Sequence, residues 1–360
     1  MSKIGGTDLA SYTGTDIDLA AAYSDGTFTS GDTLYTITSM EAMGGTSIAT
    51  VKMPSTVTSL PNRCFDGCKS LTSVSFPGIK TIGNYAFLNC SALTGISIPE
   101  GAKVGEGAFQ YCTGLKGTLT IPNGANIAYR AFDGCSGIES IVLHSGMTSG
   151  DSWHIGCFMS MSGVKSVSIK YDDGKNTIPA NVFGGASFSK DVTLEIDKDI
   201  TGIGVGAFYS AKFPTYLELS QFTSIGSHAF DGNTTLANKD VTFAENTTIG
   251  EAAFSGCTGL SGTLTIPSGA YVGYEAFYGC SGIETLVINT GTADHATSFN
   301  GNGHAFSKMG SVTNVEIVNG GNNEIPNNTF QGAAFNASVA LTIQESITAI
   351  GDNAFSSVVS

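Results

Sequence analysis

The eight cysteines are the most reactive side chains in this 360-residue sequence. Cysteines and histidines in closely spaced pairs would predict a zinc site, and cysteines brought into contact would predict disulfides. No Cys-x-x-Cys pair with matching histidines occurs, so a zinc site is not expected. Six of the cysteines instead share one place in the sequence, three residues after a phenylalanine: Cys68, Cys90, Cys112, Cys135, Cys257 and Cys280.

The same place also accepts apolar residues, namely Met161, Ala186, Ala211, Met309 and Ala333. A position that exchanges cysteine for alanine and methionine is typical of a buried apolar slot, so free buried thiols are expected. Disulfides are the alternative, because neighbouring strands lie about 4.8 Å apart, within the range of a disulfide. Cys64 and Cys68 form the pair in which a bridge would be sought first.

Histidine is the second source of chemistry, and there are five: His144, His154, His228, His295 and His304. Most lie in or beside two long insertions, which also hold Asp151, Trp153 and Asp294. The two insertions do not preserve each other's histidines, so we expect solvated loops without a metal or catalytic site. Trp153 is the candidate ligand contact there, since a lone tryptophan in a surface loop is a typical anchor for binding.

A sequence repeat determines where these cysteines and histidines lie. It is marked by a phenylalanine every 22 to 29 residues. A period of about 20 to 29 residues is that of leucine-rich repeats, in which one short strand alternates with a return segment. We expect the phenylalanines to form an internal stack, with an exposed aromatic stripe as the alternative. The thirteen residues are Phe65, Phe87, Phe109, Phe132, Phe158, Phe183, Phe208, Phe230, Phe254, Phe277, Phe306, Phe330 and Phe355.

One repeat unit shows the expected elements. Residues 71–77 alternate apolar and small polar side chains, which predicts a short strand with Val74 and Phe76 inward, closed by Pro77. A second, shorter apolar segment follows, and in most units a glycine comes directly after it, as in Ile82-Gly83. Three units carry proline instead, at Leu60-Pro61, Ile178-Pro179 and Ile325-Pro326.

The array contains an internal duplication. Phe65 to Phe208 and Phe87 to Phe230 are each 143 residues apart, and the later pairs follow at 145 to 148. A block of six units therefore occurs twice, and Phe355 opens a third copy. Residues 1–45 lack the motif and are predicted to be an N-terminal cap, while residues 46–360 form the array. The sequence ends five residues after Phe355, which predicts that this end meets further chain or another subunit.

The composition restricts the partners. The formal net charge is -14, and Arg63 and Arg130 are the only arginines. Nucleic acid and anionic membranes need a basic surface, so neither is expected as a partner. The sequence has no apolar run of about 18 residues, so membrane insertion is not expected, and no signal peptide is visible at residues 1–6.

The pattern Ile-Gly-x-x-Ala-Phe-x-x-Cys-x-x-Leu-Thr-x-Val-x-Ile-Pro resembles the BspA-like, or Treponema pallidum type, leucine-rich repeat over roughly residues 46–360. The resemblance implies a right-handed β-solenoid of about thirteen coils with parallel strands. It also implies an extracellular or cell-surface protein that adheres to host matrix, to other cells or to glycans. It brings no catalytic residues and no cofactor.

The outward positions of the predicted strands are the remaining candidate site. They are mostly serine and threonine, which suit either an exposed strand face or an uncharged surface for an extended protein or glycan. The candidate ligand-binding residues are Trp153, Glu195, Tyr216, Glu218, Thr242, Thr265, Thr285 and Glu316. The favoured function is a non-enzymatic binding scaffold. The alternatives are self-assembly through the C-terminal end and, third, a polysaccharide-acting solenoid enzyme.

Overall fold

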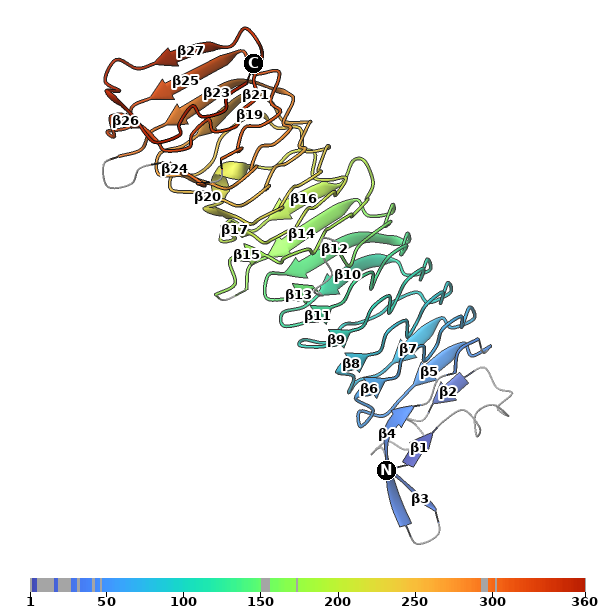
Figure 1. Ribbon diagram of the computed structural model, residues 1–360. Helices are drawn as coiled ribbons and strands as arrows, with labels where there is room; N and C mark the ends of the chain where they lie inside the picture. Colours follow the sequence, from blue (N-terminus) through green and yellow to red (C-terminus); the bar gives the residue numbers. More distant parts are fainter. Residues whose placement is uncertain are drawn as a thin grey trace. The chain divides into compact units, whose positions relative to one another are not determined.

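The computed structural model describes residues 2–4, 16–18, 27–30, 33–40, 43–45, 47–149, 156–172, 174–292, 297–301 and 303–359 (Figure 1). The chain is a parallel β-solenoid of about 12 turns with almost no helix, as the repeat predicted. It divides into two compact units, which we describe separately. Unit 1 comprises Met1–Asp172 and Ala186–Ile196, and unit 2 comprises Asp173–Gly185 and Asp197–Ser360.

In unit 1 the predicted strands form a ladder that we call the long-strand ladder. It has two parts, and all of its strands are parallel: β2 (Asp16–Asp18), β5 (Thr50–Lys52) and β7 (Ser73–Ser75), then β10 (Gly117–Ile121), β12 (Ile138–His144), β14 (Ser166–Lys170) and β16 (Thr193–Ile196). Residues before the array contribute β2 to this ladder. They also form a separate sheet of β1 (Ser2–Ile4), β4 (Thr33–Met40) and β3 (Thr27–Ser30). The boundary at residue 45 stays a prediction.

The return segments form a second ladder, the short-strand ladder, which the sequence did not predict. Its strands in unit 1 have two residues each: β6 (Ser59–Leu60), β8 (Thr81–Ile82), β9 (Lys103–Val104), β11 (Asn126–Ile127) and β13 (Thr148–Ser149). The inward apolar residue of these short strands is buried, for example Leu60, Ile82 and Val104. Each coil therefore packs the core from two sides.

Unit 2 repeats this arrangement. Its long-strand ladder is β19 (Lys239–Val241), β21 (Ser261–Ile266), β23 (Ile283–Asn289), β25 (Asn314–Val318) and β27 (Ala340–Ile343). Its short-strand ladder is β15 (Thr177–Ile178), β17 (Gly202–Ile203), β18 (Ser224–Ile225), β20 (Thr248–Ile249), β22 (Tyr271–Val272) and β24 (Ser298–Phe299), and then, separately, β26 (Glu324–Ile325) with β28 (Ala349–Ile350). A single 3₁₀ turn, η1 (Leu219–Gln221), is described.

The phenylalanines form the internal stack that the sequence predicted. In unit 1, ring centroids from Phe65 to Phe109 are 5.0 to 5.2 Å apart, and in unit 2 the Phe208, Phe230 and Phe254 centroids are 5.1 to 5.2 Å apart. The stacked residues are buried, whereas Phe355 is 36% exposed. An exposed aromatic stripe at this position is therefore excluded for Phe65 to Phe330.

A tight turn carries each phenylalanine. In most coils the residues two before and two after it adopt the left-handed conformation, as Tyr85 (φ 56°) and Asn89 (φ 59°) do around Phe87. Between them, the Phe87 N–H donates to the Ala108 carbonyl of the next coil at 2.7 Å. This conformation is costly for most side chains, which accounts for the glycine and asparagine found at many of these places.

The three prolines mark where the short-strand ladder starts. In most other coils a glycine after the short strand donates its N–H to the preceding coil, as Gly273 does to the Ile249 carbonyl at 2.8 Å. Proline has no N–H to donate. Accordingly Pro61 and Pro179 follow β6 and β15, the first strands of their ladders, and Pro326 follows β26, which does not pair with β24.

Candidate functional site

All eight cysteines are buried and none is in a disulfide, which confirms the predicted buried thiols and excludes the Cys64–Cys68 bridge. The thiol at the shared position also has a hydrogen-bonding role that the sequence did not predict. Cys90 Sγ donates to the Phe65 carbonyl at 3.0 Å, and Cys112 Sγ donates to the Phe87 carbonyl at 2.9 Å. The cysteines therefore link successive phenylalanine turns.

Burial raises the pKa of Cys135 and of Cys280 to about 12, because the thiolate loses its hydration. Only about one part in ten thousand of each is thiolate at pH 8, and the thiolate is the reactive form. We therefore expect iodoacetamide to modify both at least 100-fold more slowly in the folded protein than in urea, as followed by peptide mass spectrometry. Labelling of Cys135 at equal rates in both conditions would contradict this burial.

Two of the three described histidines, His144 and His228, contact carboxylates, while the His304 ring packs edge-on against Tyr274. His144 Nδ1 lies 2.9 Å from Asp172 Oδ1, and Asp172 Oδ2 accepts the Gly146 N–H at 2.9 Å, so this group ties neighbouring turns together. His228 Nδ1 lies 2.9 Å from Asp231 Oδ2. Among the described residues, no group of three or more His, Cys, Asp or Glu could hold a metal ion. Trp153, His154 and His295 lie outside the described residues.

The outward strand positions of unit 2 align in two rows across the long-strand ladder. One row is Thr263, Thr285, Asn314 and Ala340, and the other is Thr265, Val287, Glu316 and Thr342. Thr242 is exposed and follows β19 directly. Their inward neighbours Leu264, Leu286 and Val315 are buried. The candidates Thr242, Thr265, Thr285 and Glu316 thus lie on one ladder face about 19 Å across.

The remaining ligand-binding candidates, Glu195, Tyr216 and Glu218, are divided between the two units. Glu195 belongs to unit 1, where it is exposed at the outward side of β16 and aligned with Ser168. Tyr216 and Glu218 belong to unit 2, and no strand includes them. Tyr216 is 62% exposed, and its hydroxyl donates to Glu218 Oε2 at 3.2 Å.

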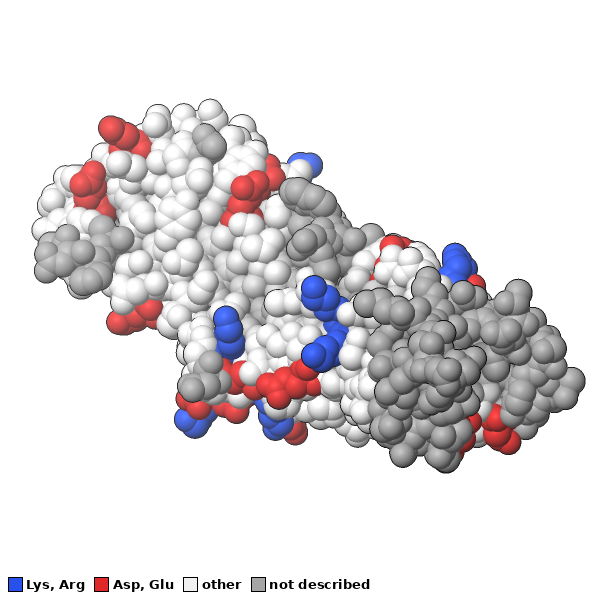
Figure 2. All heavy atoms as spheres, turned by 90° about the horizontal axis from the view of Figure 1, so that it is seen from below, with Lys and Arg blue, Asp and Glu red and all other residues white. Residues whose placement is uncertain are grey.

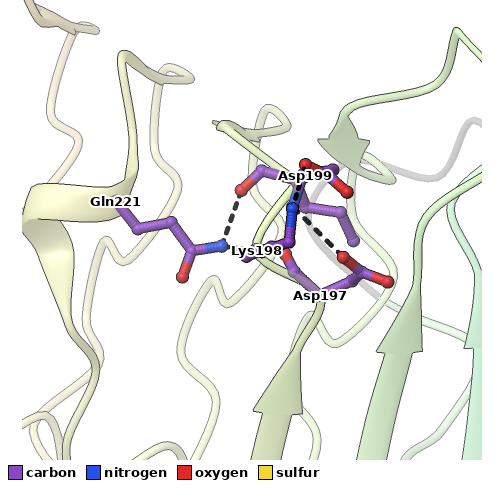
Figure 3. Close-up of polar contacts among 5 residues, drawn as sticks. Asp197, Lys198, Asp199 and Gln221 are labelled. Atoms are coloured by element: carbon purple, nitrogen blue, oxygen red, sulfur yellow. Dashed lines mark hydrogen bonds and ion pairs between the residues drawn. The ribbon is translucent and has the colours of Figure 1, made fainter.

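Glu218 has a structural role that its residue type alone did not reveal. Its carboxylate caps η1 by accepting the Ser220 hydroxyl at 2.7 Å and the Ser220 N–H at 3.3 Å, and these bonds lower its pKa. At the other end of η1, the Gln221 amide donates to the carbonyls of Asp197 and Ile200 (Figure 3). Glu218 therefore organises this turn, and Tyr216 is the more available of the two for a ligand.

Charge is sparse on the face shown in Figure 2. Acidic side chains lie scattered over a mostly uncharged described surface, and lysine and arginine occur there in small separate groups. On this face the described residues form no basic stripe of the kind that a polyanion needs. No described helix is long and apolar enough to cross a membrane.

Two cavities lie where ladders are interrupted. In unit 1, residues 94–99 form no strand between β7 and β10, and a cavity of about 290 Å³ opens there, lined in part by Val74, Phe76 and Ile96. Gly95 lies in the middle of this segment, where it weakens a strand. Val74 and Phe76, expected in the core, are only half-buried because they border this opening.

In unit 2, a cavity of about 340 Å³ lies at the interruption between β24 and β26. Its lining is mostly polar: Thr297, Ser298, Asn322, Glu324, Asn327 and Asn328, with Phe299 and Pro326. Sequence reasoning missed this site, because isolated Ser and Asn residues form no motif. The available signal was Pro326, which takes the place of the usual glycine.

The last coil of unit 2 exposes apolar side chains. Leu341, Ile343 and Ile350 are 47%, 40% and 64% exposed, and one edge of β27 pairs with no described strand. This is the surface through which the sequence predicted self-association or contact with further chain, and that expectation stays a prediction.

The family follows from a comparison with family models. The model described as BspA type leucine rich repeat region (6 copies) matches residues 36–160, 117–237, 153–284 and 223–360. The chain belongs to this family. The coil geometry above, with buried Phe and Cys at fixed places, is thus that of a BspA-type repeat. Comparison with curated proteins found no match.

Solved structures of bacterial leucine-rich repeat proteins are similar to this BspA-type chain. One from Bacteroides ovatus has 20% identity, covers 95% of this chain and 72% of its own, and has a TM-score of 0.41. The pneumococcal vaccine antigen PcpA has 20% identity, coverages of 89% and 78%, and a TM-score of 0.46. A leucine rich cell surface protein from Faecalibacterium prausnitzii has 20% identity, coverages of 81% and 86%, and a TM-score of 0.33.

Proposed function

We propose that this BspA-type protein is a non-enzymatic binding scaffold at the bacterial cell surface, which holds an extended protein or glycan ligand on its long-strand ladder. The observation that carries the proposal is the pair of outward rows in unit 2, which runs in register from β21 to β27. The structural relatives that are named as a cell surface protein and a vaccine antigen support the location.

The chemistry of the rows suits recognition. Hydroxyl and amide groups of Thr263, Thr285 and Asn314 lie side by side on a rigid sheet, so a ligand meets preorganised hydrogen-bonding groups at little entropic cost. Glu316 adds one carboxylate to the second row. No cofactor is needed for such binding.

Replacing Thr265 and Thr285 together with lysine tests the proposal. We expect the double variant to lose at least about tenfold in affinity for whichever of a panel of immobilised matrix proteins and glycans the unmodified protein binds, as measured by surface plasmon resonance. Bulky charged side chains would fill the flat rows without entering the core.

Thr248→Lys is the matched control, because Thr248 is the exposed residue of β20 on the short-strand ladder. It should leave the affinity unchanged. Equal binding by all three proteins would contradict a site on the long-strand ladder of unit 2.

A further inference from the structure

We propose that the cavity between β24 and β26 is a binding site for a neutral saccharide of one or two pyranose rings. This site lies on the short-strand ladder of unit 2, so it does not depend on the outward rows of the long-strand ladder. The saccharide proposal can therefore be refuted while the proposed function stands, and the proposed function can be refuted while the saccharide proposal stands.

Pro326 accounts for the existence of the cavity. In four coils of unit 2 a glycine N–H at this place donates to the carbonyl of the preceding coil, and the bond recurs at 2.8 Å from Gly351 to Ile325. Pro326 cannot make the equivalent bond to Phe299, so β24 and β26 stay apart. The Phe299 carbonyl receives no hydrogen bond from any described residue.

The polar side chains around the cavity are largely unused. Within the described part of the chain, the side chains of Ser298, Asn322, Glu324 and Asn328 make no hydrogen bond. The Asn327 side chain uses only its amide oxygen Oδ1, which accepts the Asp352 N–H at 2.6 Å. Amide donors, a hydroxyl, a carboxylate and a main-chain carbonyl therefore border one space.

Thr297 differs from these groups, because its interactions are internal. Its hydroxyl lies 2.6 Å from the Asn289 carbonyl and 3.1 Å from the Pro267 carbonyl, and the residue is 2% exposed. It anchors the start of β24 and so fixes one wall of the cavity. The neighbouring Phe299 is 7% exposed and packs edge-on against Phe306, which holds that wall in place.

This set of groups selects the class of ligand. Sugar hydroxyls both donate and accept, so they can satisfy Glu324 and the Phe299 carbonyl on one side and the Asn322 and Asn328 amides on the other. Among the described residues, no lysine or arginine lines the cavity, so the Glu324 carboxylate disfavours an anionic sugar. A volume of about 340 Å³ is at the small end of ligand pockets.

Saturation-transfer NMR with glucose, galactose, mannose, N-acetylglucosamine and glucuronic acid tests the site directly. We expect at least one neutral sugar to bind and glucuronic acid to bind at least about tenfold more weakly. Asn322→Ala and Asn328→Ala should each lower the affinity for that sugar by roughly fivefold to tenfold, since each removes a hydrogen-bonding group. Asn126→Ala, which removes an exposed amide from β11 of unit 1, is the matched control and should have no effect.

Pro326→Gly is the second test, because it supplies the N–H that faces the Phe299 carbonyl. We expect the two strands to pair and sugar binding to fall more than about tenfold, while Pro179→Gly, at the first strand of the ladder, leaves binding unchanged. Thermal melts followed by circular dichroism establish that each variant is folded. Binding by none of the neutral sugars, preference for glucuronic acid, binding of Ca²⁺ in place of sugar, or full affinity in folded Pro326→Gly would overturn the proposal.

Discussion

Replacing Phe254 with alanine is expected to lower the free energy of unfolding of unit 2 by about 3–5 kcal/mol. Phe254 is fully buried, and its ring stacks on Phe230 at 5.2 Å and on Phe277 at 5.4 Å. Alanine would remove both stacking contacts and leave a cavity that the neighbouring coils cannot close, since their spacing is set by the ladders. Urea denaturation followed by circular dichroism measures the loss.

Phe355→Ala provides the matched control for this prediction. Phe355 holds the same place in its coil, but it is 36% exposed and has one ring neighbour, Phe330, at 5.2 Å. Its loss should cost less than about 2 kcal/mol, because water already reaches the ring. Equal destabilisation by the two substitutions would contradict the dependence on burial.

Replacing Asn233 with alanine is expected to cost about 3 kcal/mol, the second largest effect. Asn233 stands where six other coils have cysteine, and it is fully buried. Its amide donates to the Phe213 carbonyl at 2.8 Å, and its Oδ1 accepts the Leu236 N–H at 3.1 Å and the Thr235 hydroxyl at 2.9 Å. Alanine would leave the buried Leu236 N–H without its hydrogen-bond acceptor and remove the bond to the Phe213 carbonyl.

Hydrogen exchange measures this effect where it arises, because coils of a repeat array depend mainly on their neighbours. The Leu236 amide should exchange faster in Asn233→Ala than in the unmodified protein. Thr234→Ala, at the adjacent exposed residue, should change the stability by less than about 0.5 kcal/mol. Unchanged protection of Leu236 would show that water replaces the lost amide.

The sequence predicted the elements that repeat in residue type. Phenylalanine and cysteine recur at fixed places, and a position that exchanges Cys for Ala or Met must be buried, so the stack and the free thiols followed directly. The long strands also followed, since alternation over five to seven residues is a usable signal. The short-strand ladder did not, because two residues show no periodicity.

The candidate site was harder to predict, because it depends on hydrogen bonds that residue types do not reveal. Glu218 looked like an exposed ligand contact, yet it caps η1 through Ser220. The cavity beside Pro326 is lined by common polar residues, and four of their side chains make no hydrogen bond within the described part of the chain. Which carbonyl a missing N–H leaves unpaired becomes visible only when the coils are stacked.

The prolines also bear on how such an array can change in length. Pro179 and Pro326 belong to equivalent coils of the duplicated block, and each follows the first strand of a new short-strand ladder. The ladder therefore restarts with the same six-coil period as the duplication. Within the described residues, a block gained or lost at these two prolines would interrupt no hydrogen bond of the short-strand ladder, so the prolines divide the repeat into separable modules.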